Sequence, residues 1–464
     1  MKKIITCASV LMAVVFTSCT DFLDIKPYGK TIPQSAEEFS ALLHTTCQKI
    51  DEGSDDVLMC SSRMALTFEE MSDNMETCLT EYPAGRMLAT YMGENINNRQ
   101  SDYTRLYEHI RTANIILGEF KEDRNTQEAK DLIGTAYAMR GVAYYQLMRM
   151  FCAPPLAEDG NLGVPIVTEF DMEAKPARAS MEATIKQIES DLNAAIQCEI
   201  QEDMYRFNTD VMKGYLARLY HWCGRWSEAR QISLELLQKH PMIDVLDDYR
   251  KMMSTQDGLC GNMLIKANRM STNMDVSLQY LTARPYSVRY TGLFEEKSAD
   301  TRWNFFFNRK RKARTSAPYK LPFAGMRSAE FAFIAMESAY HLGNEAEALQ
   351  MLNAFRAKRI KDCEAFTMLT LPDIREDEYI KEDCYGKPLT KLLYNILRER
   401  RKEFLMENGD RFFELKRNGR PEWTVYTDGM AYRNEKFMYT FPINVQDFAV
   451  QPSLIQNPGY EKTY

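Results

Sequence analysis

The sequence predicts a mostly α-helical protein, built as a superhelix of paired helices of the tetratricopeptide type with long irregular insertions. Apolar residues recur at three- and four-residue steps over long segments, as in amphipathic helices. Two segments carry the signature of a helix-turn-helix repeat. No run of alternating strands is obvious, and the chain of 464 residues is long enough for a large core.

The first 18 residues have the pattern of a cleaved secretory signal. Lys2 and Lys3 give a basic start, and residues 4–16 form an apolar run too short to span a bilayer. Small residues follow this run and precede Cys19. An N-terminal core helix is the alternative, but nothing polar patterns one face of the segment.

The segment Phe16-Thr17-Ser18-Cys19 resembles a bacterial lipobox, whose cysteine becomes the first residue of the mature chain and carries lipid. The departure is Phe16, where leucine is usual. Two or three acyl chains hold a protein on a membrane stably, whereas one holds it only marginally. We therefore expect Cys19 to be a lipid anchor; the alternative is an ordinary secreted protein with a cysteine at this position.

The clearest repeat occupies residues 214–241, "GYLARLYHWCGRWSEARQISLELLQKHP". Small residues such as Ala229 let two helices approach each other, and Gly224 permits the turn between them. One repeat cannot bury its own apolar face, so a second is expected. Gly343 and Ala348 repeat the five-residue spacing of Gly224 and Ala229.

Helix pairs are expected near 101–153, 180–241, 326–360 and 390–418. They are not in tandem, because residues 47–100 and 252–326 have poor periodicity and mix Gly, Pro, Asn, Ser and aromatic residues. Long irregular segments on a rigid scaffold are where binding sites usually lie. The charged segment 398–419 is expected to form a solvated helix face with a structural role rather than a catalytic one.

Composition excludes some classes of partner. The formal net charge of -7 becomes -9 when Lys2 and Lys3 leave with the signal, and a mildly acidic protein is not expected to bind nucleic acid. Of eleven cysteines, nine remain after Cys7 is removed and Cys19 is acylated, and no CxxC motif occurs. We expect most of them to be small buried residues in helices, with an occasional disulfide possible.

The chain lacks the usual catalytic motifs. Its five histidines form no HExxH or similar metal-binding pair, and no GxSxG occurs. Gly29-Lys30-Thr31 is similar to the end of a P-loop, but Asp24 stands where the earlier glycine is required. We therefore expect no catalytic residue, metal site or cofactor. A glycosidase pair of carboxylates is defined by spatial separation, so one sequence leaves it open.

Six segments follow the lipobox in order: "SCTDFLDIKP", "LYEHIRTANIIL", "YAMRGVAYYQLMRMFCAPPL" with "GVPIV", "AEFAFIAMESAYHLGNEAEALQMLNAFRAKR", "RERRKEFLMENGDRFFELKRNG" and "FPINVQDFAVQPSLIQNPGY". Together they resemble the SusD/RagB family, the outer-membrane nutrient-binding lipoproteins of Bacteroidetes, over nearly the whole chain. The departures concern packing more than function: Tyr103 replaces a common Trp, Asn444 interrupts a Pro-Ile-Pro, and Gln451 replaces the Asn of an Asn-Pro pair.

The resemblance implies one SusD-like domain over 19–464, with an N-terminal SusD-like part at about 19–240 and a C-terminal RagB/SusD part at about 250–464. It also implies a protein held on the outside of the outer membrane by Cys19. Such a protein binds an oligomeric nutrient, most often a glycan, and passes it to a TonB-dependent, SusC-like transporter; the family has no known catalytic function. The alternative is a lipid-anchored scaffold that organises other surface proteins and binds no nutrient.

Aromatic side chains that face solvent in the insertions would favour ligand binding over a scaffold, because sugars present flat C–H faces to aromatic rings. The insertions contain Tyr82, Tyr91, Tyr280, Tyr286, Tyr290 and Trp303. We expect some of these, with Tyr91, Tyr286, Tyr290 and Trp303 as the candidates, to contact the ligand, although aromatic residues are more often core.

Polar candidates lie in two segments. Asp73 and Asn74 fall in a segment similar to the family's ligand-proximal N-terminal region, and they are expected to bind hydroxyl groups. Trp303 precedes a basic run that includes Arg309 and Arg311, which would pair with carboxylate or sulfate groups of an anionic glycan. The alternative is that residues 305–307 are core and the basic run is a solvated loop.

Overall fold

The protein is mostly helical in the computed structural model, which confirms the predicted fold class. The structure describes residues 33, 35–52, 54, 57–76, 80–81, 87–88, 92–96, 99–171, 173–255, 260–267, 285–314, 318–427 and 429–460. Cys19, Tyr82, Tyr91 and Tyr280 lie outside the described residues.

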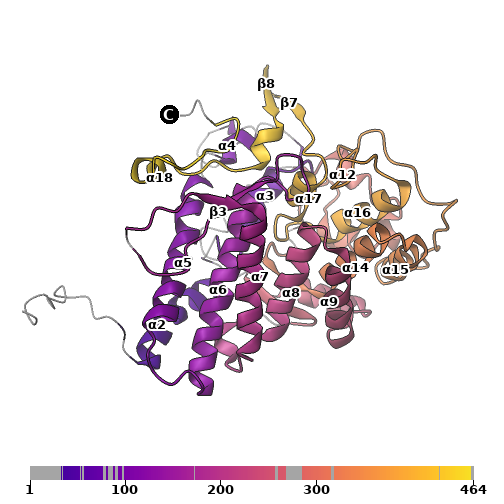
Figure 1. Cartoon of the computed structure of the whole chain (residues 1–464). Coiled ribbons are helices and arrows are strands. Elements are labelled where there is room, and N and C mark those ends of the chain that lie inside the picture. The colour runs from indigo at the N-terminus through magenta and orange to yellow at the C-terminus, as the bar shows by residue number, and fades with distance from the viewer. Residues whose placement is uncertain are drawn as a thin grey trace, which may run out of the picture.

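A row of helices packed side by side forms the larger part of the molecule (Figure 1). It consists of α2 (Ala36–Asp51), α5 (Gln100–Glu119), α6 (Gln127–Phe151), α7 (Met181–Gln197), α8 (Thr209–Trp222) and α9 (Trp226–Lys239). Local sequence sets where several of these helices begin. The side chains of Thr126, Ser180 and Asn208 accept a backbone hydrogen bond at the N-termini of α6, α7 and α8, as N-cap residues do.

A second group of helices continues this row: α14 (Ser328–His341), α15 (Glu345–Ala357), α16 (Lys391–Glu403) and α17 (Asp410–Arg417). Helix α14 packs against α9, α15 and α16, so the C-terminal helices extend the surface that the N-terminal ones form. The turns between α8 and α9 and between α14 and α15 contain Gly224 and Gly343, at φ +71° and +82°. These left-handed conformations favour glycine, as the repeat signature predicts.

The expectation of a solvated charged face on α16 is wrong. Residues from Arg398 to Glu403 are all buried, and Lys402 and Glu403 are fully so. Each charge meets a partner from another part of the chain or from α16 itself; Lys402 Nζ, for example, lies 3.1 Å from a carboxylate oxygen of Asp300. Buried charges of this kind are tolerated only when they are paired and hydrogen-bonded.

Short antiparallel strand pairs, which the sequence reasoning missed, accompany the helices. They are β1 (Thr80–Glu81) with β2 (Met87–Leu88), β3 (Leu162–Pro165) with β4 (Arg178–Ser180), β5 (Met263–Ala267) with β6 (Ala324–Arg327), and β7 (Trp423–Thr427) with β8 (Met430–Asn434). The β7–β8 pair projects at the top of the view in Figure 1, beyond the ends of the packed helices. In β7–β8, register runs without a bulge from Trp423 opposite Asn434 to Thr427 opposite Met430.

The remaining elements are short: α3 (Ser62–Glu70), α4 (Met92–Ile96), α10 (Leu246–Ser254), α12 (Val288–Thr291), α13 (Trp303–Phe306), α18 (Val445–Val450), η2 (Asp203–Tyr205), η3 (Lys297–Ala299) and η4 (Lys436–Tyr439). Several of them enclose a second apolar core that is rich in aromatic rings. It contains Tyr286, Tyr290 and the buried run Phe305, Phe306 and Phe307, as the core interpretation of 305–307 expects.

The eight described cysteines are free thiols. Cys47, Cys60, Cys152 and Cys384 are buried, and the other four are half-buried. Burial fits the expectation of small apolar residues, but of these only Cys47 lies within a helix. Within the described ranges, no helix is long and apolar enough to cross a membrane.

Candidate functional site

A cleft of about 480 Å³ lies where α3, α12 and the β7–β8 pair meet. We call it the aromatic cleft, and its lining is Glu70, Met71, Ser72, Asp73, Met75, Glu76, Met92, Ser287, Val288, Arg289, Asp377, Tyr379, Trp423, Thr424, Val425, Tyr426 and Asn434. A volume of this size is typical of small-ligand sites, which combine apolar and aromatic walls with a few polar groups.

Three side chains of the aromatic cleft form a stacked column. The rings of Tyr379 and Trp423 lie 5.0 Å apart between centroids and are inclined by only 17°. The guanidinium carbon of Arg289 lies 3.7 Å from the centroid of the Tyr379 ring. Cation–π contact and ring stacking hold the three planar groups in one arrangement, which gives the cleft a rigid aromatic wall.

Polar atoms and exposed apolar groups accompany this column. The Nε atom of Arg289 is buried and has no hydrogen-bond partner among the described residues, although a buried N–H group normally has one. The Tyr426 side chain is 78% exposed and that of Val288 is 60% exposed, and both line the cleft. An unsatisfied donor beside exposed apolar surface is typical of a binding site rather than of a packing interface.

Backbone pairing brings distant segments together at the cleft. Met75 pairs with Tyr286 in an antiparallel bridge, and the Ser287 N–H donates to the Asn74 carbonyl oxygen at 2.7 Å. The Ser287 hydroxyl donates to the carbonyl oxygen of Asp73 at 2.9 Å. The two irregular insertions of the sequence therefore meet at one site.

The floor of the cleft is a buried ionic cluster around Asp73. Arg411 donates two hydrogen bonds to the Asp73 carboxylate, at 2.7 and 2.9 Å, and Arg401 lies 3.1 Å from it. Burial alone would raise the pKa of Asp73, but these two guanidinium groups outweigh it and hold the pKa well below its ordinary value. Asp73 is therefore ionised and fixed in place, with Glu378 as the second carboxylate that Arg411 binds.

Four of the predicted residues lie in or beneath this cleft, but not all in the expected role. Asp73 lines the cleft, whereas Asn74 lies below it, donating to Glu69 at 2.7 Å and accepting from Arg401 at 2.7 Å. The expectation that Tyr286 and Tyr290 face solvent is wrong, because both are 0% exposed. Their rings pack against each other and against Phe307 in the second core.

The basic segment lies beside the cleft rather than within it. Arg311 donates to the Tyr286 carbonyl oxygen at 2.7 Å and pairs with Glu76, which lines the cleft. Arg309 is exposed, and Trp303 is half-buried with its ring 5.1 Å from that of Phe307. Arg311 therefore helps to hold the cleft segments, and neither Trp303 nor Arg309 lines the cleft.

The sequence patterns did not predict the column of Arg289, Tyr379 and Trp423. A signal for Trp423 exists: alternation in "WTVYT" and "MAYRN" flanks Asp428-Gly429, and an Asp-Gly dipeptide between alternating segments predicts a hairpin. Tyr379 lies in an irregular segment with no local pattern. No group of three or more His, Cys, Asp or Glu residues in the described part of the chain is arranged to hold a metal ion.

Comparisons with known proteins agree with this architecture. Residues 21–221 match a family model described as "Starch-binding associating with outer membrane", and residues 279–460 match the model of the SusD family. A search of curated proteins gave no match.

Solved structures of similar fold cover nearly the whole chain. A putative sugar binding protein from Bacteroides vulgatus is 21% identical with a TM-score of 0.66, covering 93% of this chain and 100% of its own. A SusD-like carbohydrate binding protein from the same organism is 17% identical with a TM-score of 0.67, covering 91% and 98%. A SusD superfamily protein from Bacteroides fragilis is 18% identical with a TM-score of 0.68, covering 91% and 100%. With the two family models in order along most of its length, the chain belongs to the SusD/RagB family.

Proposed function

We propose that this protein is a cell-surface lipoprotein that binds an oligomeric glycan in the aromatic cleft and delivers it to a TonB-dependent, SusC-like transporter of the outer membrane. The stacked column of Arg289, Tyr379 and Trp423 is the observation that carries the binding part. The lipobox at Cys19 supports the anchor, and the family resemblance supports the transporter.

The cleft has the groups that a sugar requires. The half-buried Trp423 ring and the largely exposed Tyr426 ring at the rim offer apolar surface to the C–H groups of a pyranose. Tyr379 supports Trp423 from behind, since its own faces are covered by Arg289 and Trp423. Hydroxyl groups both donate and accept, so they need partners of both kinds. The guanidinium group of Arg289, whose side chain is 22% exposed, supplies N–H donors, and the carboxylates of Glu76 and Asp377 supply acceptors.

Replacing Trp423 by alanine is expected to weaken glycan binding by about tenfold or more, because the stacking surface is lost and Tyr379 loses its neighbour. Affinity electrophoresis through gels that contain amylopectin, xylan or pectin identifies the polysaccharide that retards the wild-type protein. Isothermal titration calorimetry with its oligosaccharides then gives the affinity of each variant.

Trp303→Ala is the matched control, because it removes the same side chain from a neighbouring aromatic cluster that does not line the cleft. It is expected to leave affinity within about twofold of wild type. The opposite result, with Trp303→Ala weakening binding and Trp423→Ala not, would place the ligand beside the basic segment. Salt-sensitive binding of an acidic polysaccharide alone would then identify the basic groups as its partners.

The lipid anchor is tested separately. The mature N-terminus is expected to begin at Cys19 with acyl chains attached, which mass spectrometry of the purified protein detects. Cys19→Ser is expected to move the protein from the membrane fraction to the soluble fraction, since the acyl chains supply the membrane affinity. Surface exposure is checked by adding protease to intact cells. An unmodified Cys19, or complete protection from the protease, would contradict the proposed location.

A further inference from the structure

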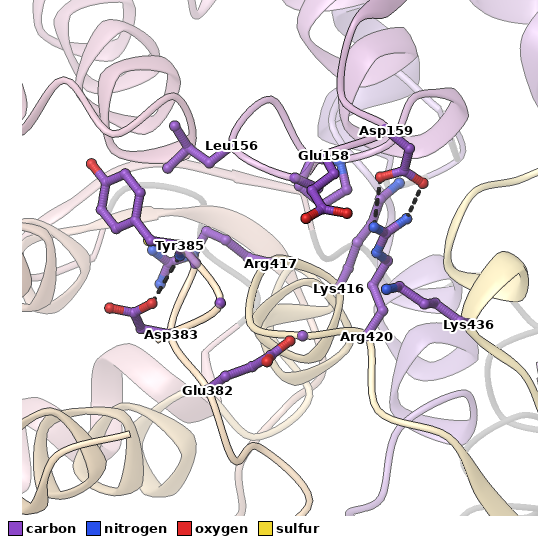
Figure 2. A pocket seen from close by; sticks show the side chains of 15 residues that line it. Leu156, Glu158, Asp159, Glu382, Asp383, Tyr385, Lys416, Arg417, Arg420 and Lys436 are labelled. Carbon is purple, nitrogen blue, oxygen red and sulfur yellow. Dashed lines mark hydrogen bonds and ion pairs between the residues drawn. The ribbon is translucent and has the colours of Figure 1, made fainter. Parts of the chain in front are cut away.

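A second and larger cavity, of about 610 Å³, has a lining that includes sequence neighbours of aromatic-cleft residues. We call it the second cavity. It is lined by Pro154, Leu156, Ala157, Glu158, Asp159, Glu382, Asp383, Cys384, Tyr385, Gly386, Lys416, Arg417, Gly419, Arg420 and Lys436. Figure 2 shows the loop that carries Glu158 and Asp159 on one side of this space and the segment that carries Glu382 on the other.

Three segments of the chain contribute to both sites. Tyr379 and Glu382, Trp423 and Arg420, and Asn434 and Lys436 each place one residue in the aromatic cleft and one in the second cavity. The members of each pair are two or three residues apart, and an extended chain covers about 3.3–3.6 Å per residue. In each pair the two residues are therefore at most roughly 10 Å apart, so the two sites have neighbouring walls.

Most charged groups of the second cavity are already paired. Arg420 donates to both oxygens of the Asp159 carboxylate, at 2.7 and 2.6 Å. Lys416 Nζ donates to the carbonyl oxygens of Arg149 and Met150 at the end of α6. Arg417 binds carboxylates on α14 and α17, away from open solvent. These contacts fix the walls: Arg417 and Arg420 are balanced by carboxylates, whereas the partners of Lys416 are neutral carbonyl oxygens.

Three polar side chains of the lining are not held by such contacts. Glu158, Glu382 and Lys436 make no side-chain hydrogen bond or ion pair with any residue that the structure describes, and all three line the cavity. In Figure 2 the carboxylates of Glu158 and Glu382 extend from opposite sides toward the same space. The cavity thus offers two acceptors and one donor to a ligand.

An aromatic ring completes the lining. Tyr385 is 44% exposed, and its hydroxyl accepts a hydrogen bond from Trp226 Nε1 at 2.8 Å. The ring of His341 packs at 5.7 Å from that of Tyr385. Tyr385 is therefore held in one position while part of its ring stays open to the cavity.

We propose that the second cavity is a further subsite for the glycan of the aromatic cleft, binding neutral sugar units through Glu158, Glu382, Lys436 and Tyr385. This inference rests on the proposed function, since it adds a second subsite for the same glycan. The charged side chains of the lining are four acidic ones (Glu158, Asp159, Glu382 and Asp383) and four basic ones (Lys416, Arg417, Arg420 and Lys436). The cavity therefore has no net formal charge that would select acidic sugars. Hydroxyl groups, by contrast, can donate to both carboxylates and accept from Lys436.

The test compares oligosaccharides of two lengths by isothermal titration calorimetry. Maltotriose and maltoheptaose are the probes, and xylo-oligosaccharides of the same two lengths replace them if xylan is the polysaccharide that retards the wild-type protein. The double variant Glu158→Ala, Glu382→Ala is expected to bind the heptasaccharide about tenfold more weakly, because two charge-assisted hydrogen bonds are lost. Its affinity for the trisaccharide, which fits the aromatic cleft alone, is expected to stay unchanged.

The matched control is Glu128→Ala with Glu345→Ala, two exposed glutamates at the starts of α6 and α15 that line neither site. It removes the same charge and is expected to bind both lengths as the wild type does. Heptasaccharide binding that is unchanged in the Glu158, Glu382 variant but lost in Trp423→Ala would overturn this inference and leave the proposed function standing. If the wild-type protein binds no oligosaccharide and no polysaccharide, both are wrong.

Discussion

Replacing Glu403 by glutamine is expected to lower the free energy of unfolding by about 3–5 kcal/mol, because it breaks the centre of a buried ionic cluster. Glu403 is 0% exposed and meets three arginines. Arg327 donates to its carboxylate at 2.7 Å, Arg359 at 3.0 and 3.1 Å, and Arg302 at 3.4 Å. These three arginines are at most 2% exposed.

The physical reason is an imbalance of buried charge rather than the loss of one hydrogen bond. Burial would raise the pKa of Glu403, but the charges of Arg359, Arg327 and Arg302 outweigh it and hold the pKa well below its ordinary value. Glutamine keeps the shape and one acceptor but removes the negative charge. Three guanidinium groups would then share fewer compensating charges in a low-dielectric interior.

Urea denaturation followed by circular dichroism measures this effect. Glu182→Gln is the control, since Glu182 forms an exposed i, i+4 pair with Lys186 at 2.8 Å. That variant is expected to leave the denaturation midpoint unchanged, because solvent screens exposed pairs. Equal midpoints for wild type and Glu403→Gln would mean that the buried cluster contributes no net stability.

The helical framework could be predicted because its signals are local. Gly224 and Gly343 mark the turns of two helix pairs through their backbone conformation, and apolar spacing marks the helices around them. The burial of α16 could not be predicted in this way. Its Glu and Arg spacing is compatible with a solvated face. Only partners from other parts of the chain, such as Arg359 and Arg302 for Glu403 and Asp73 for Arg401, make it a buried cluster.

The candidate site was predicted in part. The region around Asp73 does line the cleft, and it meets the second insertion there. Tyr286 and Tyr290 were expected at the surface because composition cannot distinguish a ring in an apolar core from one on a binding surface. Trp423 and Tyr379, which form the wall, are brought together by tertiary packing across 44 residues, and no local pattern records that contact.

Replacing Glu69 by glutamine is expected to remove a pH-dependent loss of stability. Glu69 is 2% exposed beneath the aromatic cleft; it accepts from Asn74 at 2.7 Å and from the Met406 N–H at 3.3 Å. Burial raises the pKa of Glu69 from 4.5 to about 7, although the hydrogen bond from Asn74 and the charge of Arg401 lower it. The folded protein therefore prefers the protonated form.

The direction follows from proton binding in the two states. Between pH 4.5 and about 7, the unfolded chain has released the Glu69 proton and the folded protein still holds it. The stability that this group contributes is fully present below pH 4.5 and is lost as pH rises toward 7, at about 1.4 kcal/mol per pH unit. Glu69→Gln cannot titrate, so its stability relative to wild type should rise over this range by about 3 kcal/mol.

Urea denaturation of both proteins at several pH values from 4.5 to 8 measures the difference. Asp410, whose pKa burial raises to about 6, titrates in both proteins, so its contribution cancels. Glu330→Gln is the matched control. Burial would raise the pKa of Glu330, but the charge of Arg218 outweighs it and lowers the pKa. The folded protein therefore takes up this proton only below pH 4.5. Its difference from wild type should stay constant between pH 4.5 and 7, whereas that of Glu69→Gln changes. Parallel curves for wild type and Glu69→Gln would mean that Glu69 is already ionised in the folded protein at pH 5, with Arg401 close enough to compensate for burial.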